Sequence, residues 1–159
     1  MLIVADENTS VNMPIERSAG IIIFRDTPKG RRYLIIRSSY HGKDGKYNFW
    51  DFPKGLLEKG EEGIDAAKRE AKEEAGIKDF KIVPEFKETV RYFVRDRAWG
   101  KKAVLKFVAL FLAEVKKDKV KLSWEHDEYA WLPYKEAYER LSRQEMKKAL
   151  ESAKSFLSS

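Results

Sequence analysis

One stretch of 23 residues, GLLEKGEEGIDAAKREAKEEAGI from Gly55 to Ile77, constrains the fold of this chain more than any other. Gly76 stands where helices commonly end in left-handed backbone, so we predict a helix over 64–75. Its apolar residues recur at helical spacing, at Ile64, Ala67, Ala71 and Ala75. A stripe made mostly of alanines is narrow and shallow. We therefore expect this helix to lie close against a flat surface, such as a sheet.

The same stretch holds seven carboxylates, although the chain has a formal net charge of +6. Glu70, Glu73 and Glu74 stand at i, i+3 and i+4, which places them on one helical face. Like charges at this spacing repel by roughly 0.2–0.5 kcal/mol per pair. An acidic helix face is most often only solvated, but this crowding also fits a cation that compensates it from outside the helix.

Composition limits which cation that is. The chain has no cysteine, which excludes disulfides and thiolate metal sites. His41 and His126 are too few and too far apart for a zinc site built from histidines. A hard cation with oxygen ligands stays open.

The length of 159 residues fits a single domain with its own core. We expect an extension over 1–16, which has no clear period, and one domain over 17–159. No stretch approaches the roughly 18 apolar residues that span a membrane, and the N-terminal apolar run is short for a signal peptide, so we expect no membrane association and a cytoplasmic location. The sequence pI near 9.3 is explained equally well by an anionic partner and by solubility.

The remaining patterns predict a mixed sheet with helices on its faces. A long polar loop containing three glycines leads into a short strand over 40–55, and Pro133 suits the first turn of a helix. A second helix is expected over 144–157. The predicted strands, rich in β-branched and aromatic residues, are 18–26 and 31–39 around the turn TPKG, 80–96 and 101–115 around RAWG, and 128–133.

The acidic stretch also follows a longer pattern. Gly55 is followed after five residues by Glu61, and after seven more by the run Arg69-Glu70-Ala71-Lys72-Glu73-Glu74-Ala75-Gly76-Ile77. This pattern resembles the signature of the Nudix hydrolases. The resemblance implies an α/β fold, an α/β/α sandwich with a mixed sheet. It also implies hydrolysis of a nucleoside diphosphate linked to another group, with Mg²⁺ as the usual cofactor and Mn²⁺ as a substitute.

The chemistry agrees with this resemblance. Mg²⁺ prefers oxygen ligands and is usually held by one or two carboxylates together with substrate phosphates. Arg69 is expected to pair with Glu61 or with a helix acid and so hold a carboxylate in place. A carboxylate must also take the proton of the attacking water, and our candidates are Glu70, Glu74 and, third, Glu125. The expected metal ligands are Glu70, Glu73, Glu74 and the backbone of Gly55.

Outside the signature, Trp50, the run Phe52-Pro53-Lys54, ETVRYF over 88–93 and EHDEYAWL over 125–132 look like the asymmetric diadenosine tetraphosphate hydrolases of the animal and archaeal type. The resemblance implies that Lys54 contacts phosphates, that Tyr92 and Tyr129 stack on adenine, and that Glu125 assists the metal site. Lys101 or Lys102 is the expected basic partner on the facing strand. The alternative is that both tyrosines are half-buried strand aromatics and that Glu125 is structural.

Three functions stay open from the sequence. The first is cleavage of a dinucleoside polyphosphate to ATP and AMP. The second is the same chemistry on RNA 5′ ends, oxidised nucleotides, ADP-ribose or diphosphoinositol phosphates; RNA is disfavoured because the basic residues are spread along the chain. The third is a nucleotide- or RNA-binding module without activity, against which the intact glutamates argue. The oligomeric state is left open.

Overall fold

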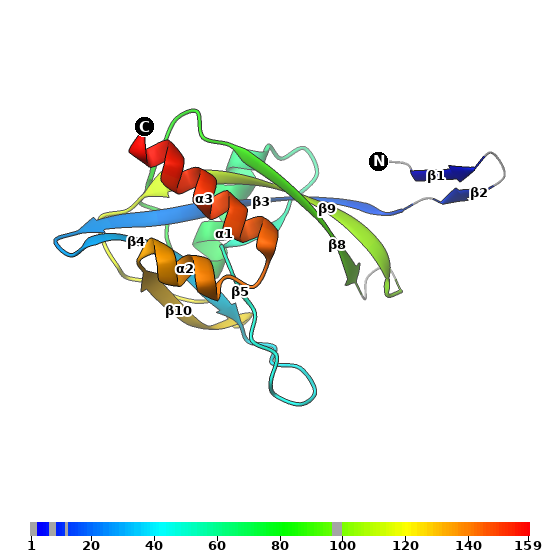
Figure 1. Ribbon diagram of the computed structural model, residues 1–159, viewed down its shortest axis with the longest axis horizontal. Coiled ribbons are helices and arrows are strands. Elements are labelled where there is room, and N and C mark those ends of the chain that lie inside the picture. The colour runs from blue at the N-terminus through cyan, green and yellow to red at the C-terminus, as the bar shows by residue number, and fades with distance from the viewer. Residues whose placement is uncertain (1–2, 7–8, 12, 97–99) are drawn as a thin grey trace.

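The computed structural model describes residues 3–6, 9–11, 13–96 and 100–159. Its centre is a mixed sheet that lies between helices. Figure 1 shows α1 (Gly63–Ala75) behind the sheet and α2 (Tyr134–Arg140) and α3 (Gln144–Ser158) in front of it. This arrangement is the α/β/α sandwich expected from the sequence.

The main sheet runs in the order β10-β4-β3-β9-β7, with β5 added to β4, β6 to β3 and β8 to β9. The long strands β3 and β9 are parallel, whereas every other described pair in this sheet is antiparallel. β1 and β2 pair with each other in a separate two-stranded sheet. The bounds are β1 Ile3–Asp6, β2 Thr9–Val11, β3 Ile15–Thr27, β4 Gly30–Ser38, β5 Trp50–Asp51, β6 Lys54–Leu56, β7 Lys81–Ile82, β8 Glu88–Asp96, β9 Lys102–Glu114 and β10 His126–Leu132.

Side chains of the central strands alternate between two cores, as the pleat requires. In β3, Ile21 and Ile23 pack towards α1, while Ile22 and Phe24 pack towards α2 and α3. The α1 side of the interface is small: Ala66, Ala67, Ala71 and Ala75 are all fully buried. The prediction that alanines bring this helix close to a sheet is confirmed.

The strands β3 and β4 separate along part of their length, and the segment that lies between them positions the site. β3 pairs with β4 only where Phe24–Thr27 meet Gly30–Tyr33. Towards its start β3 pairs instead with β6, and the far half of β4 pairs with β5. The segment 50–56 therefore lies between the two diverging strands, where the carbonyl of Pro53 accepts a hydrogen bond from the backbone N–H of Ile21 at 3.1 Å.

The helix predicted over 64–75 is α1, one residue longer at its start. Gly76 ends it in left-handed backbone with φ 67°, and its N–H donates to the carbonyl of Lys72 at 3.0 Å while the N–H of Ile77 donates to that of Ala71 at 3.3 Å. The bond from Gly76 to Lys72 is that of the αL arrangement of a helix C-terminus.

Three details differ from the prediction. β3 begins at Ile15, so the boundary expected between 16 and 17 falls within a strand. The run 80–96 is divided into β7 and β8 by a turn that contains Pro84 and Glu85, the latter with φ 71°. Most of the predicted RAWG turn, residues 97–99, lies outside the described residues.

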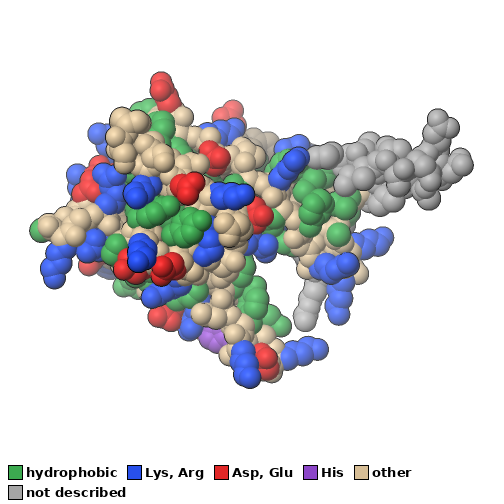
Figure 2. Space-filling model, in the orientation of Figure 1, with side chains coloured by type: hydrophobic (Ala, Val, Ile, Leu, Met, Phe, Trp, Pro, Cys, Tyr) green, Lys and Arg blue, Asp and Glu red, His purple; other side chains and the backbone are tan. Residues whose placement is uncertain are grey.

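The surface is basic without one dominant patch on the visible face. Figure 2 shows lysine and arginine side chains distributed over the face that carries α2 and α3, with acidic side chains among them. Within the described residues, none of the helices has the length and apolarity needed to cross a bilayer.

Candidate active site

The segment 50–56, which is inserted between β3 and β4 and is called the inserted segment below, brings Lys54 and Gly55 against the acidic face of α1. A Cβ atom at Gly55 would overlap the carboxyl group of Glu70, so only glycine leaves room for this carboxylate. The backbone N–H of Lys54 donates to Oε1 of Glu74 at 3.0 Å. Two helix glutamates are thus fixed at one point of the segment.

Arg69 connects the other acids. Its guanidinium donates to both carboxylate oxygens of Glu61 at 2.9 Å, to Oε1 of Glu70 at 2.8 Å and to Oε2 of Glu73 at 3.3 Å. It also donates to the carbonyl of Leu56 at 2.9 Å, which ties the helix to the inserted segment. The predicted choice between Glu61 and a helix acid is resolved, because Arg69 binds both.

These contacts divide the carboxylates by pKa. Hydrogen bonds from Arg69 and from the backbone N–H of Glu58 lower the pKa of Glu61 to about 2. Burial raises the pKa of Glu70 despite its bond from Arg69. Burial, together with the charges of Glu70 and Glu125, also raises the pKa of Glu74 to about 8, although the N–H and ammonium of Lys54 oppose this shift. Burial is thus the main reason why Glu70 and Glu74 ionise less readily than Glu61.

Lys54 is paired with a carboxylate that the sequence interpretation missed. Asp51 is only 6% exposed, and its Oδ2 lies 3.5 Å from Nζ of Lys54. Burial opposes the charge on Lys54, but Asp51, Tyr92 and Glu74 together raise the pKa of its ammonium. The signal available in the sequence was an acid within an aromatic run, Trp50-Asp51-Phe52.

Glu125 reaches the same region from the loop before β10. The N–H of Ser39 donates to the carbonyl of Glu125 at 2.9 Å, and the N–H of Ser123 donates to that of Glu74 at 3.3 Å. The negative charge of Glu125 contributes to the raised pKa of both Glu70 and Glu74. The structure thus places Glu125 beside the helix acids from a distant part of the sequence, while its role in catalysis stays a prediction.

The two predicted tyrosines are in different environments. Tyr129 on β10 is 42% exposed. Tyr92 on β8 is 6% exposed, and the guanidinium carbon of Arg143 lies 4.0 Å from its ring centroid. Stacking on adenine requires an open ring face. Tyr129 meets this requirement, and in this conformation Tyr92 does not.

Lys101 and Lys102 are not brought to the site. Through the strand pairs, Lys54 is level with Gly20 and Leu110, so Lys102 lies eight residues away along β9, about 26 Å in an extended strand. Lys106 pairs directly with Tyr92 across β8 and β9, and so shares its face of the sheet. It is the basic residue of the facing strand that lies nearest to Tyr92, and only the register of the two strands could have identified it.

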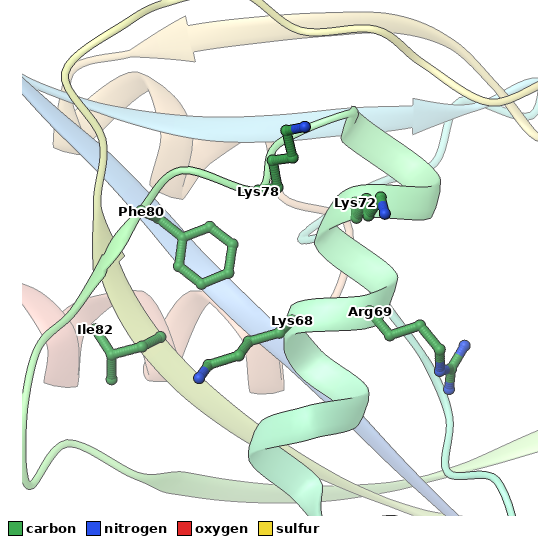
Figure 3. Close-up of a pocket in the computed structure, with 6 residues that line it drawn as sticks. All are labelled: Lys68, Arg69, Lys72, Lys78, Phe80 and Ile82. Atoms are coloured by element: carbon green, nitrogen blue, oxygen red, sulfur yellow. The ribbon is translucent and has the colours of Figure 1, made fainter.

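A hollow of about 340 Å³ lies beside α1. Figure 3 shows Lys68 extending towards Phe80 and Ile82, whereas Arg69 points to the other side of the helix. Arg69, Lys72 and Lys78 complete its lining. None of these described residues is a carboxylate, and the hollow shares Arg69 with the acidic site.

The donors at the acidic site fit a hard divalent cation. All are oxygens, and the close approach of Gly55 and Glu70 leaves no room for a Cβ. The acids are not yet arranged as a set of metal ligands. Among the described residues, no group of three or more Asp, Glu, His or Cys side chains is placed so that it could hold a metal ion. Instead, Arg69 binds Glu70 and Glu73.

Comparison with known proteins establishes the family. The family model of the NUDIX domain matches residues 14–153. The chain belongs to the Nudix family.

Individual relatives show which members of the family the chain resembles. The chain is 34% identical over 149 residues to the asymmetrical bis(5′-nucleosyl)-tetraphosphatase of Mus musculus, with 90% of this chain and 96% of that protein covered. The enzyme of the same name from Sus scrofa is 36% identical with the same coverage. An RNA pyrophosphohydrolase of Bartonella henselae is 35% identical over 83 residues, which covers 50% of this chain and 46% of that protein.

Among solved structures, a binary complex of C. elegans Ap4A hydrolase superposes with a TM-score of 0.77 at 30% identity, covering 90% of this chain and 98% of that one. A MutT protein from Methanosarcina mazei Go1 gives a TM-score of 0.69 at 25% identity, covering 90% and 95%.

Proposed function

We propose that the protein is a Mg²⁺-dependent hydrolase that cleaves diadenosine tetraphosphate asymmetrically, giving ATP and AMP. The observation that carries this proposal is that Glu70 and Glu74 meet the end of the inserted segment, at Gly55 and Lys54, next to a charged lysine. The similarity to asymmetrical tetraphosphatases over almost their whole length supports the substrate class.

In this proposal Glu70, Glu73, Glu74 and the backbone of Gly55 hold the cation. When bound, Mg²⁺ would neutralise charge on the phosphate chain and lower the pKa of a water. Arg69 keeps Glu70 in position, and Lys54, held as an ammonium beside Asp51, binds a phosphate group.

The remaining step is a proton transfer and an in-line displacement. One of Glu70, Glu74 and Glu125 accepts the proton of the attacking water. The water attacks one phosphorus, and the bond between this phosphorus and the bridging oxygen opposite the water breaks. The leaving nucleotide keeps the bridging oxygen, so the products are ATP and AMP. Tyr129, with its exposed ring, is the proposed base-stacking residue.

Activity on diadenosine tetraphosphate with Mg²⁺ tests the proposal, with products separated by chromatography. Reaction in ¹⁸O water should label one of the two products and so identify the phosphorus attacked. Glu74→Gln should reduce kcat by about 10²-fold or more, as expected for a residue that supports the cation or takes the proton, while the melting temperature stays near that of the wild type. Full activity of this variant would exclude the proposed site.

A second candidate is removal of pyrophosphate from triphosphorylated RNA 5′ ends. It is favoured by the similarity of half of this chain to RNA pyrophosphohydrolases. Release of pyrophosphate from such RNA, with no turnover of any dinucleotide, would replace the first proposal by this one. Tight nucleotide binding without hydrolysis in either Mg²⁺ or Mn²⁺ would instead indicate a binding module.

A further inference from the structure

The turn before β10 carries the most exposed large hydrophobic side chain among the described residues. Trp124 is 86% exposed, so nearly the whole indole ring lies in solvent. A tryptophan usually buries much of its large apolar surface, and tryptophans are enriched where proteins bind other molecules. A single exposed apolar side chain is ordinary on a protein surface, so the significance of Trp124 depends on where the chain holds it.

Trp124 and Glu125 are the two central residues of a tight turn. The N–H of His126 donates to the carbonyl of Ser123 at 3.1 Å, which closes the turn over four residues. Ser39, just after β4, fixes the corner of this turn. Its hydroxyl donates to the carbonyl of Trp124 at 3.0 Å, and its N–H donates to that of Glu125 at 2.9 Å. The backbone of Trp124 is therefore held by hydrogen bonds that do not involve its ring.

The turn is attached to α1 at the acidic site. The N–H of Ser123 donates to the carbonyl of Glu74 at 3.3 Å, and the N–H of Lys121 donates to that of Ala75 at 2.9 Å. The segment before the turn thus runs beside the last residues of α1, and Trp124 directly follows the residue that is bonded to Glu74. An exposed ring is therefore carried by backbone that adjoins one of the proposed cation ligands.

The ring of Trp124 is not engaged with another ring. Tyr40, which follows Ser39, has its ring 5.7 Å from that of Tyr47, measured between centroids, and Tyr47 stacks in turn on Phe49 at 5.8 Å. Trp124 has no such contact with a ring or a cation in the part of the chain that the structure describes. The indole face is open to a planar ligand, and every nucleobase has a π-face that stacks on such a ring.

The proposed substrate carries two bases, one at each end of its polyphosphate chain. Tyr129 is the exposed ring proposed above for one of them. It lies three residues after His126 in β10, about 10 Å along an extended strand, so the rings of Trp124 and Tyr129 start from separate places on the backbone. The end of β10 that is next to the acids thus offers one exposed ring for each base.

We propose that Trp124 stacks on the second base of a dinucleoside polyphosphate, the base that Tyr129 does not bind. The identity of the substrate rests on the function proposed above. The stacking itself requires only a planar base on a phosphate chain that is bound at the acids, so it can be measured without hydrolysis.

Steady-state kinetics give the first test. Trp124→Ala removes the ring, and Trp124→Phe keeps an aromatic face. Phe156→Ala is the matched control, because Phe156 is also exposed but lies on α3, on the opposite face of the sheet from α1. With diadenosine tetraphosphate we expect Trp124→Ala to raise KM about tenfold with little change in kcat, as for loss of one base–aromatic stack. Trp124→Phe should recover most of the loss, and Phe156→Ala should have the KM of the wild type. An unchanged KM in Trp124→Ala, or an equal rise in Phe156→Ala, would overturn the proposal.

A binding measurement separates this proposal from the proposed function. Calorimetric titration with a diadenosine tetraphosphate analogue that has methylene groups in place of its bridging oxygens needs no turnover. The matched ligand is β,γ-methylene ATP, whose single base can occupy the Tyr129 position. Binding of the two-base analogue that weakens about tenfold in Trp124→Ala, with a clearly smaller effect on the one-base ligand, supports the stacking site even if no dinucleotide is hydrolysed. Equal affinities of the wild type and Trp124→Ala for the two-base analogue, equal losses for both ligands, or no binding of the analogue to the wild type reject it, whatever the enzyme assays show.

Discussion

At the scale of single residues, the site depends on a glycine, which leaves space for a carboxylate, and on an arginine that donates several hydrogen bonds. Gly55 leaves the space that the carboxylate of Glu70 fills, and Arg69 holds that carboxylate together with Glu61 and Glu73. Neither residue needs to touch the substrate to determine where the acids lie.

Gly55→Ala should therefore affect both stability and activity. The new Cβ would overlap the Glu70 carboxyl group, so either the helix or the segment must move. We expect a loss of about 1–3 kcal/mol in the free energy of unfolding, typical of an overpacked core, and a fall in kcat. Urea unfolding and steady-state kinetics measure the two effects.

The matched control is Gly63→Ala, whose Cβ would be 3.5 Å from the ring of Phe111, an ordinary contact. It should keep wild-type stability and kinetics. If Gly55→Ala behaved like this control, the close fit between Gly55 and Glu70 would be irrelevant to the site.

Glu61 gives a prediction about acid stability. Its pKa is lowered in the folded protein to about 2, below its ordinary value of 4.5, so its contribution is present above pH 4.5 and is lost as the pH falls towards 2. The difference in unfolding free energy between the wild type and Glu61→Gln should accordingly stay constant from about pH 6 to 4.5 and shrink from there to about pH 3. Urea titrations across this range measure it, with Glu62→Gln, at the N-cap position of α1 and without a side-chain capping bond, as the comparison. A difference that stays constant with pH would mean that the ion pair with Arg69 contributes nothing.

The sequence predicted the residues of the acidic site better than the residues around Lys54 and Tyr92. Glu70, Glu74 and Gly55 could be placed together because they lie within one helix and the segment just before it. Lys106 and Asp51 could not be recognised, since their importance comes from strand register and from burial, which are contacts between distant parts of the chain.

At the scale of elements, the close contact between α1 and the sheet determines the distance between the helix glutamates and the inserted segment. The buried residues that form this contact on the helix are mostly alanines, and their spacing alone predicted it. The hairpin of β3 and β4, the pair of β8 and β9 and the two C-terminal helices were equally accessible from local patterns. The split between β3 and β4 was not, because the segment that enters it, residues 50–56, is short and has no period.

Ala71→Leu tests this contact. The side chain of Ala71 is fully buried against the sheet, so added methyl groups should lift α1 and cost about 1–3 kcal/mol in unfolding free energy. Because Glu70 and Glu74 move with the helix, we also expect a loss of kcat. Lys72→Ala, at the next and exposed position, should change neither quantity by much. Full activity of the Ala71→Leu variant would show that the site tolerates movement of the helix.

At the scale of the whole molecule, β1 and β2 form a unit outside the main sheet, whereas the pairing of β3 with β9 starts at Ile15. Truncation to a chain that begins at Met13 should therefore leave the melting temperature within about 2 °C of the wild type, since the main sheet keeps all of its described strands.

Truncation to a chain that begins at Ser18 is the informative contrast. It removes the strand pairs of Ile15, Glu16 and Arg17 with β9 and the ion pair of Glu16 with Lys106. We expect this protein to melt at least several degrees lower. Equal melting temperatures for the two truncated proteins would show that the start of β3 adds nothing to the stability of the sheet.

The split sheet has a consequence for how this scaffold can be altered. The acid-bearing helix and the segment that faces it are both anchored to β3, while the loop over 40–49 is mostly exposed. Exchanging this loop for one of other length or charge should redirect the protein to different phosphorylated compounds while the bond-breaking centre keeps its shape, which makes it the first place to randomise in directed evolution.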